Sequence, residues 1–230
     1  MYRDFKYKLA EDTISNLEIA KLSKWLIKSK RLTQGRKVDK FEENFSNYLN
    51  VKKSIFVNSG SSANLLIAQS LLESGYLKNK TVIAPAVSWA TTVSPFIQLG
   101  YDVKLCDCSY KDLGLDISHL EYLCKRYKPS VIILVHVLGH SNNMKEILKL
   151  CKKYNIYLVE DTCEALGSKY NSKHLGTFGI ASSFSFYYGH HISTIEGGMA
   201  CTNNKNLANI MISVRSHGWL RDFNETEKRK

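Results

Sequence analysis

The sequence has 230 residues, of which 44% are hydrophobic, 11% aromatic and 23% charged, a balance typical of a globular protein. It excludes a disordered chain, a collagen-like fibre and a simple coiled coil, and no apolar run approaches the ~20 residues that a membrane-spanning helix needs. The 32 basic and 21 acidic residues leave a net charge of +11, which suits an anionic small molecule; because the basic residues are scattered, we expect neither nucleic-acid nor membrane binding.

Residues 1–50 are predicted to be an N-terminal helical segment. Apolar residues recur at mostly helical spacing over 12–30 and again over 38–49. Gly35 separates these two stretches and indicates a break between two helices.

From residue 54 onward, short apolar runs alternate with helical stretches. The runs, which we expect to be strands, are Ser54–Val57, Thr81–Ala84, Val103–Cys106, Val131–Val135, Ile156–Val159 and Ala181–Phe186. The helical candidates between them are at 62–75, 89–99, 116–127 and 142–154. This alternation predicts an α/β fold with a mostly parallel sheet covered by helices on both faces. Ligands bind such sheets at the carboxyl ends of the strands, so the residues that follow each run are candidate site residues.

The first run ends in Asn58-Ser59-Gly60-Ser61-Ser62, directly before a predicted helix. Gly60 permits a tight turn, and backbone N–H groups at a helix start, with two hydroxyls beside them, can hold an anion. An ordinary serine cap of the helix explains the same residues equally well.

Trp89 follows the second run, at a strand-to-helix junction. An indole there can stack on a planar ring. Membership of the hydrophobic core is the commoner situation for such a residue.

Asp161 and Glu164 follow the fifth run. A carboxylate at the end of a strand, inside the crevice of a sheet, is costly unless it has a cationic partner. Such a carboxylate would keep a protonated ring nitrogen charged. Metal binding and helix capping are the alternatives.

The segment from Ser183 to Gly198 is the richest in chemical groups. The adjacent His190 and His191 point in different directions on regular backbone, so we expect no two-histidine metal clamp and no metal site. Imidazole titrates near neutrality, which suits one of them as an acid–base group. A purely structural histidine is the alternative.

Six cysteines occur without a CxxC pair, and no zinc-ligand set surrounds them. We expect ordinary reduced thiols, and therefore a cytoplasmic protein.

Together and in this order, these segments resemble the DegT/DnrJ/EryC1/StrS family, the sugar aminotransferase branch of the fold-type I pyridoxal-phosphate (PLP) enzymes. The likeness extends from Thr33-Gln34-Gly35 to Arg215-Ser216-His217-Gly218 and includes Glu196-Gly197-Gly198. It implies that residues 51–220 are the PLP-binding large domain, with a seven-stranded-type sheet sandwiched by helices.

The resemblance also assigns roles to individual residues. Gly60, Ser61 and Ser62 match the family's phosphate-binding turn, and Ser185 matches a further phosphate ligand. These four residues are therefore expected to bind the cofactor phosphate.

Three further residues match the surroundings of the cofactor ring. Trp89 matches the residue that stacks on the pyridine ring, and Asp161 matches the carboxylate that holds the pyridine nitrogen protonated. Glu164 stands where the family has a polar residue beside the ring oxygen.

One position departs from the aminotransferases of the family, which have a lysine six residues before the Glu-Gly-Gly and bind the cofactor through it. Here that residue is His190. Imidazole cannot form this covalent bond, so we expect PLP and its amine form, pyridoxamine phosphate (PMP), to bind non-covalently. A histidine here is typical of the family's sugar 3-dehydratases.

The resemblance thus implies PLP/PMP-dependent 3-dehydration of a nucleotide-linked 4-keto-6-deoxy sugar for deoxysugar and O-antigen (lipopolysaccharide) biosynthesis. The expected substrate is GDP-4-keto-6-deoxymannose, with L-glutamate as amino donor and His190 as the catalytic acid–base. The alternatives are a CDP-4-keto-6-deoxyglucose 3-dehydrase type that needs a reductase, and an inactive PLP-binding fragment.

The resemblance further implies a homodimer when the chain is full length. Members of the family continue into a smaller C-terminal domain. Residues 221–230 are therefore expected to be the polar end of a truncated chain that lacks this domain.

Overall fold

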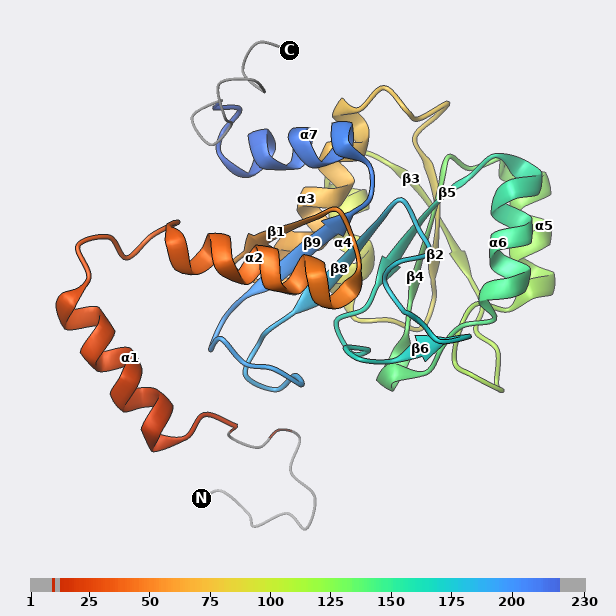
Figure 1. Ribbon diagram of the computed structural model, residues 1–230. Coiled ribbons are helices and arrows are strands. Elements are labelled where there is room, and N and C mark those ends of the chain that lie inside the picture. Colours follow the sequence, from red (N-terminus) through yellow and green to blue (C-terminus); the bar gives the residue numbers. More distant parts are fainter. Residues whose placement is uncertain (1–9, 11–12, 220–230) are drawn as a thin grey trace, which may run out of the picture.

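The computed structural model describes residue 10 and residues 13–219, so the predicted polar end at 221–230 lies outside the described residues. The helices are α1 (Asn16–Lys28), α2 (Arg36–Leu49), α3 (Gly60–Glu73), α4 (Ala90–Gln98), α5 (Ile117–Tyr127), α6 (Met144–Tyr154), α7 (Lys205–Arg215) and the short 3-10 helix η1 (Val137–Gly139). The strands are β1 (Lys53–Val57), β2 (Thr81–Pro85), β3 (Asp102–Cys106), β4 (Val131–Val135), β5 (Tyr157–Asp161), β6 (Lys169–Tyr170), β7 (Lys173–His174), β8 (Ala181–Ser185) and β9 (Gly198–Thr202). Figure 1 shows their arrangement.

Seven of these strands form one sheet in the order β1-β9-β8-β5-β4-β2-β3, and β6 pairs only with β7. All pairings in the seven-stranded sheet are parallel except those of β9, which runs antiparallel to β1 and β8. The predicted α/β fold with a mostly parallel sheet is therefore confirmed. Each of the six predicted runs is a strand, whereas β9 was missed.

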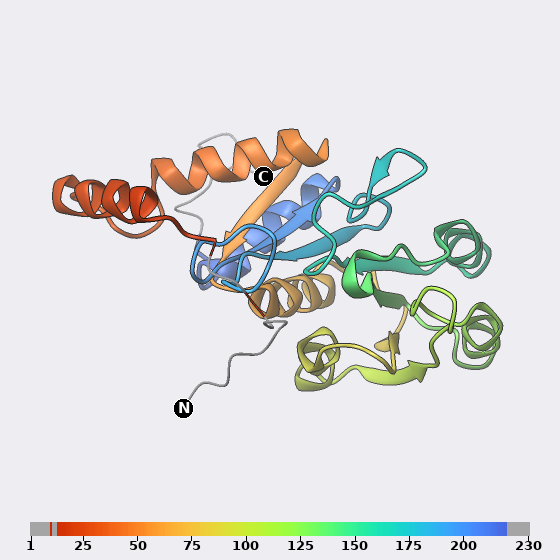
Figure 2. The ribbon, with the colours of Figure 1, turned by 90° about the horizontal axis from the view of Figure 1, so that it is seen from below.

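Helices cover both faces of the sheet because successive strand residues point to opposite sides. In β4, Val131 and Ile133 pack in one core cluster with residues of α3, α4 and α7. Ile132 and Leu134 pack in a second cluster with residues of α5 and α6. A third cluster joins α2 to β8 and β9. In Figure 2, the orange α2 and the yellow-brown α3 lie on opposite sides of the strands.

The strand register brings the predicted motifs together at one end of the strands. Asp161, the last residue of β5, pairs with Ser183 of the neighbouring parallel β8. Gly198, the first residue of the antiparallel β9, pairs with Ser185 on one side and with Val57 on the other. The carboxyl ends of β1, β5 and β8 therefore meet at the amino end of β9.

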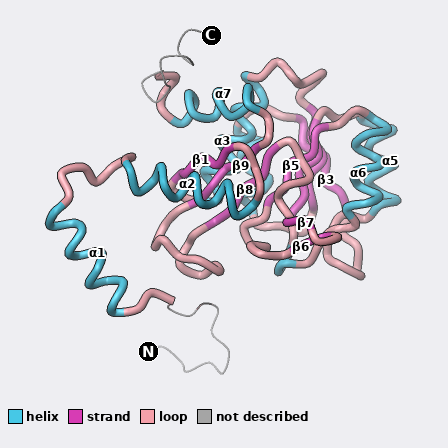
Figure 3. Tube along the Cα trace, viewed as in Figure 1, coloured by secondary structure: helices cyan, strands magenta, loops and turns pink. Residues whose placement is uncertain are grey.

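Helix α1 lies apart from the sheet (Figures 1 and 3). The prediction of helix over 12–30 was too long at both ends, because Ser15 caps the helix and Ser29 is already extended. None of its residues is buried. Its exposed apolar side chains include Leu17, Ile19, Leu22, Leu26 and Ile27.

In the described part of the chain, no helix is both long enough and apolar enough to cross a bilayer.

Candidate functional site

The turn between β1 and α3 presents unsatisfied backbone donors. Ser59 is the N-cap of α3, and its Oγ accepts a hydrogen bond from the Ser62 amide at 3.0 Å. The amides of Gly60 and Ser61 precede the first intrahelical bond and face out of the helix end. The cap and the anion cradle, posed as alternatives, are thus compatible here, because Ser59 is the cap and the two following amides stay available.

Gly60 lies at the closest approach of three chain segments. A Cβ atom there would lie 2.6 Å from Cys163 Sγ and 2.8 Å from Ser185 Cβ. Only glycine fits this position, and the absence of a side chain lets the start of α3 pack against the ends of β5 and β8. Ser185 is nearly buried, and its Oγ accepts a hydrogen bond from the Tyr187 amide at 3.3 Å.

The start of α4 joins the same group. Ser61 Oγ donates to Thr91 Oγ1 at 2.9 Å, which ties the first turns of α3 and α4 together. Trp89 stands at the N-cap position of α4 and is 75% exposed. The core interpretation of this indole is therefore wrong, because most of the side chain is exposed at the start of α4.

Asp161 is buried to 4% exposure between β5 and these helices. Its Oδ2 accepts hydrogen bonds from Thr92 Oγ1 at 2.8 Å and from Asn64 Nδ2 at 2.9 Å, and its Oδ1 accepts one from the Cys163 amide at 3.2 Å. No ion pair of the described residues includes Asp161. Sequence reasoning missed Asn64 and Thr92.

A metal ion was the other explanation considered for this carboxylate. Over residue 10 and residues 13–219, no group of three or more His, Cys, Asp or Glu side chains is placed to hold one. All six cysteines are free thiols.

His190 lies on the loop between β8 and β9, where its amide donates to the Tyr187 carbonyl at 2.9 Å. Burial lowers the pKa of the His190 imidazole below its ordinary value of 6.5. The nearby charges of Glu164 and Asp161 oppose this shift, and His191 adds to it. The ring is therefore mainly neutral at pH 7 and can accept a proton.

Glu164 is half-buried, and its Oε2 accepts a hydrogen bond from the Leu138 amide at 2.6 Å. The charge of Glu164 opposes the lowering of the His190 pKa, in keeping with the two side chains lying near each other. The structure thus places five of the predicted site residues at or just after the carboxyl ends of β1, β5 and β8: Gly60, Ser185, Asp161, Glu164 and His190.

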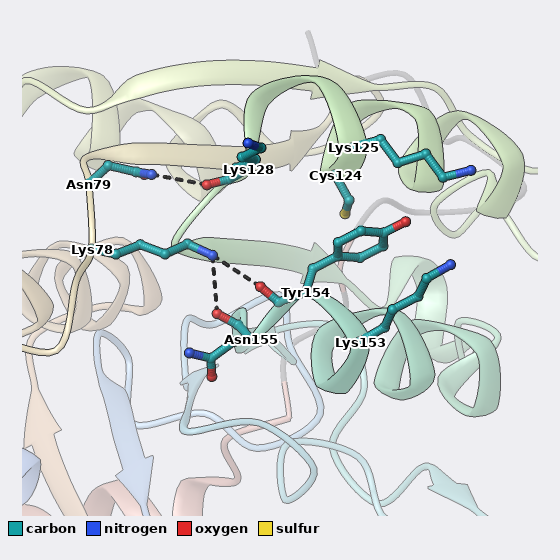
Figure 4. Close-up of a pocket in the computed structure, with 8 residues that line it drawn as sticks. All are labelled: Lys78, Asn79, Cys124, Lys125, Lys128, Lys153, Tyr154 and Asn155. Carbon is teal, nitrogen blue, oxygen red and sulfur yellow. Dashed lines mark hydrogen bonds between the residues drawn. The ribbon is translucent and has the colours of Figure 1, made fainter.

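A pocket of about 630 Å³ lies at the opposite end of the strands (Figure 4). It is lined by Lys78, Asn79, Cys124, Lys125, Lys128, Lys153, Tyr154 and Asn155. Lys78 Nζ donates to the carbonyls of Tyr154 and Asn155 at the end of α6. Lys153 Nζ donates to Glu121 at 2.9 Å. These lysines stabilise helix C-termini and form ion pairs. None of the residues that line this pocket belongs to the group that contains Asp161 and His190.

The model of the DegT/DnrJ/EryC1/StrS aminotransferase family matches residues 13–230. The chain belongs to this family. It is 35% identical, over 222 residues, to GDP-4-keto-6-deoxy-D-mannose 3-dehydratase of Yersinia pseudotuberculosis, covering 95% of this chain and 56% of that protein.

Solved structures of family members superpose closely on it. The E. coli GDP-4-keto-6-deoxy-D-mannose-3-dehydratase with bound hydrated PLP gives a TM-score of 0.87 at 35% identity, covering 96% of this chain and 57% of that one. Helicobacter pylori PseC, an aminotransferase involved in the biosynthesis of pseudaminic acid, gives 0.85 at 32% identity, covering 95% and 58%. The chain thus spans little more than half the length of these relatives.

Proposed function

We propose that the residues gathered at the carboxyl ends of β1, β5 and β8 bind PLP and PMP without a covalent bond. The residues fit the group: the Gly60 and Ser61 amides, with the hydroxyls of Ser61, Ser62 and Ser185, suit its phosphate. Asp161 is a buried carboxylate without a cationic partner among the described residues, which suits a protonated pyridine nitrogen.

Trp89 and Glu164 complete the proposed cofactor site. The exposed indole of Trp89 can stack on the ring. Glu164, at the position where the family has a polar residue, would supply a polar group beside the ring oxygen. When bound, the cofactor would supply an amino group for a ketone and a ring that takes up electrons.

We propose that the reaction is 3-dehydration of a nucleotide-linked 4-keto-6-deoxy sugar, with GDP-4-keto-6-deoxymannose as substrate and L-glutamate as amino donor. The observation that carries this proposal is that His190, an imidazole where the family's aminotransferases have an amine, lies on the loop that follows β8, the strand that pairs with Asp161. The relatives named as 3-dehydratases of that sugar support the substrate.

His190 is the acid–base of this proposal. With the cofactor bound, the neutral ring of His190 would serve as the base that accepts a proton, and the resulting imidazolium would serve as the acid that donates this proton to the departing C3 hydroxyl. Imidazolium is a stronger acid than a lysine ammonium, so it favours loss of the hydroxyl. Asp161 would hold the ring nitrogen of the bound cofactor protonated.

The proposal is tested by incubating the full chain with PLP, L-glutamate and GDP-4-keto-6-deoxymannose. We expect 2-oxoglutarate to form and the sugar product to be a 3-deoxy-4-keto sugar, identified by mass spectrometry. A 4-amino sugar would show transamination instead. Turnover only with a CDP-sugar and a reductase would favour the CDP-type alternative, and no turnover would favour an inactive PLP-binding fragment.

Borohydride reduction should leave no cofactor attached to the chain, because no amine stands at position 190. Intact-mass measurement after reduction with PLP checks this result. The variant His190→Lys supplies an amine and should gain the mass of one reduced cofactor, which makes it the positive control. A reduced cofactor on the parent chain would contradict non-covalent binding.

We also infer a homodimer and a cytoplasmic location. The apolar side chains that α1 exposes, among them Leu17, Leu22 and Leu26, would be covered by a second copy. A reducing compartment suits the six free thiols.

A further inference from the structure

We infer that Asn64 and Thr92 are positioning residues that hold Asp161 as an ionised, correctly oriented acceptor for the ring nitrogen of the cofactor. This inference rests on the proposed function, because it concerns how the same site holds PLP. It adds two residues, from α3 and α4, to which the sequence reasoning assigned no role.

The hydrogen bonds around Asp161 fix the orientation of its carboxylate. Oδ2 accepts from both Asn64 Nδ2 and Thr92 Oγ1, which fills the two lone-pair directions of that oxygen. Oδ1 accepts from the Cys163 amide at 3.2 Å, and the Cys163 thiol is a further hydrogen-bond neighbour of this carboxylate. All three partners are donors, so the carboxyl group acts only as an acceptor, as an ionised carboxylate does.

The titratable groups that face Asp161 do not supply a balancing positive charge. Burial, with the charge of Asp161 as a lesser cause, raises the pKa of the Cys163 thiol far above its ordinary value, which keeps it neutral. Burial likewise lowers the pKa of the His190 imidazole. Glu164 carries a negative charge of its own. Among the described residues, neutral donors therefore support the buried carboxylate of Asp161, and we infer that the balancing cation belongs to the ligand.

Asn64 is not explained by packing. It is 2% exposed, and its Nδ2 donates to the Thr91 carbonyl at 3.1 Å as well as to Asp161. Its Oδ1, however, is buried without a partner, which an apolar side chain of similar volume would avoid. The asparagine is explained by the hydrogen bond that it donates to Asp161.

Thr92 supplies the second donor from α4. It is 1% exposed and lies three residues after Trp89. A hydroxyl at this position therefore couples the helix that presents the indole to the carboxylate that would face the ring nitrogen.

The experiment measures the protonation of the cofactor nitrogen in the full chain, by ¹⁵N NMR of PLP labelled at the pyridine nitrogen, together with PLP affinity. The parent should hold the nitrogen protonated between about pH 6 and pH 9. In Asn64→Leu and Thr92→Val the nitrogen should lose its proton at least about one pH unit lower, and PLP affinity should fall about tenfold. Thr92→Ser, which keeps the hydroxyl, should behave like the parent.

Ser70→Ala is the matched control, because Ser70 is buried in the same helix and its hydroxyl has no partner. Thr92→Val keeps the side-chain volume, so it decides the question even if Asn64→Leu fails to fold. Parent-like titration of folded Thr92→Val, or an equal shift in Ser70→Ala, would overturn this inference alone. Failure of the parent chain to bind PLP would overturn the proposed function as well.

Discussion

Replacing His190 by asparagine should abolish dehydration while leaving PLP binding nearly unchanged. Asparagine keeps a polar side chain of similar size but cannot accept or deliver a proton at neutral pH. General acid–base catalysis contributes about 10²–10⁴-fold in rate, and His190 acts twice in the proposed reaction, so the loss should reach at least the upper part of that range. Single-turnover formation of the 3-deoxy sugar measures it.

The pH dependence gives this prediction a control. Since burial lowers the pKa of His190, its neutral, proton-accepting form persists below pH 6.5 and is lost only as the pH falls further. The acid limb of the rate profile should therefore lie below pH 6.5. The charge of Glu164 raises the pKa of His190, so Glu164→Gln should move that limb to still lower pH. Turnover by His190→Asn at the parent rate would identify another group as the base.

The six predicted strands were found because their apolar runs reflect burial on both faces of a parallel sheet. β9 was missed because it follows the loop of His190 and Glu196 with no helix between, so it breaks the alternation on which the prediction was based. It also runs antiparallel, pairing with β1 and β8. Its glycine and alanine positions give it less apolar character than the other strands.

The adjacent carboxylates of Glu160 and Asp161 show what sequence cannot decide. Strand geometry places them on opposite faces, but both are buried. Glu160 accepts hydrogen bonds from the amides of Gly176, Phe178 and Gly179, so it fixes a turn. Among the described residues, Asp161 has one backbone donor, the Cys163 amide, and in our proposal it binds the ligand. The two carboxylates differ because a turn distant in the sequence packs against Glu160, and this tertiary contact cannot be read from the sequence.

The sequence around Asn64 contains a pattern that indicates a special role for this residue. It is the one amide within the apolar stretch Ala63-Asn64-Leu65-Leu66-Ile67-Ala68, four residues after Gly60 and therefore one helical turn along α3. A polar residue within an otherwise apolar stretch of a helix points to a buried hydrogen bond. Its partner, however, is 97 residues away in the sequence and could not be inferred from spacing.

Replacing Gly198, which itself contacts no part of the cofactor in our proposal, by alanine should disrupt PLP binding. A Cβ atom at Gly198 would overlap the backbone carbonyl of Ser59 and lie 2.6 Å from the Gly60 amide nitrogen. Backbone cannot yield as a flexible side chain can, so the Ser59–Gly60 turn must move. We expect a loss of about 1–3 kcal/mol in the free energy of unfolding, as for overpacked sites. PLP affinity should fall at least about tenfold, the equivalent of about 1.4 kcal/mol.

Gly35→Ala is the control for this change, because the nearest heavy atom to a Cβ there, the Thr33 carbonyl oxygen, lies at an ordinary 3.5 Å. It should change the free energy of unfolding by no more than about 0.5 kcal/mol. Fluorescence titration with PLP and thermal unfolding of both variants separate the two effects. If Gly198→Ala melts at a lower temperature yet binds PLP as tightly as the parent, the phosphate is not held by the Ser59–Gly60 turn. The displaced backbone carries the very amides that the proposal assigns to the phosphate, so affinity and turn geometry must change together.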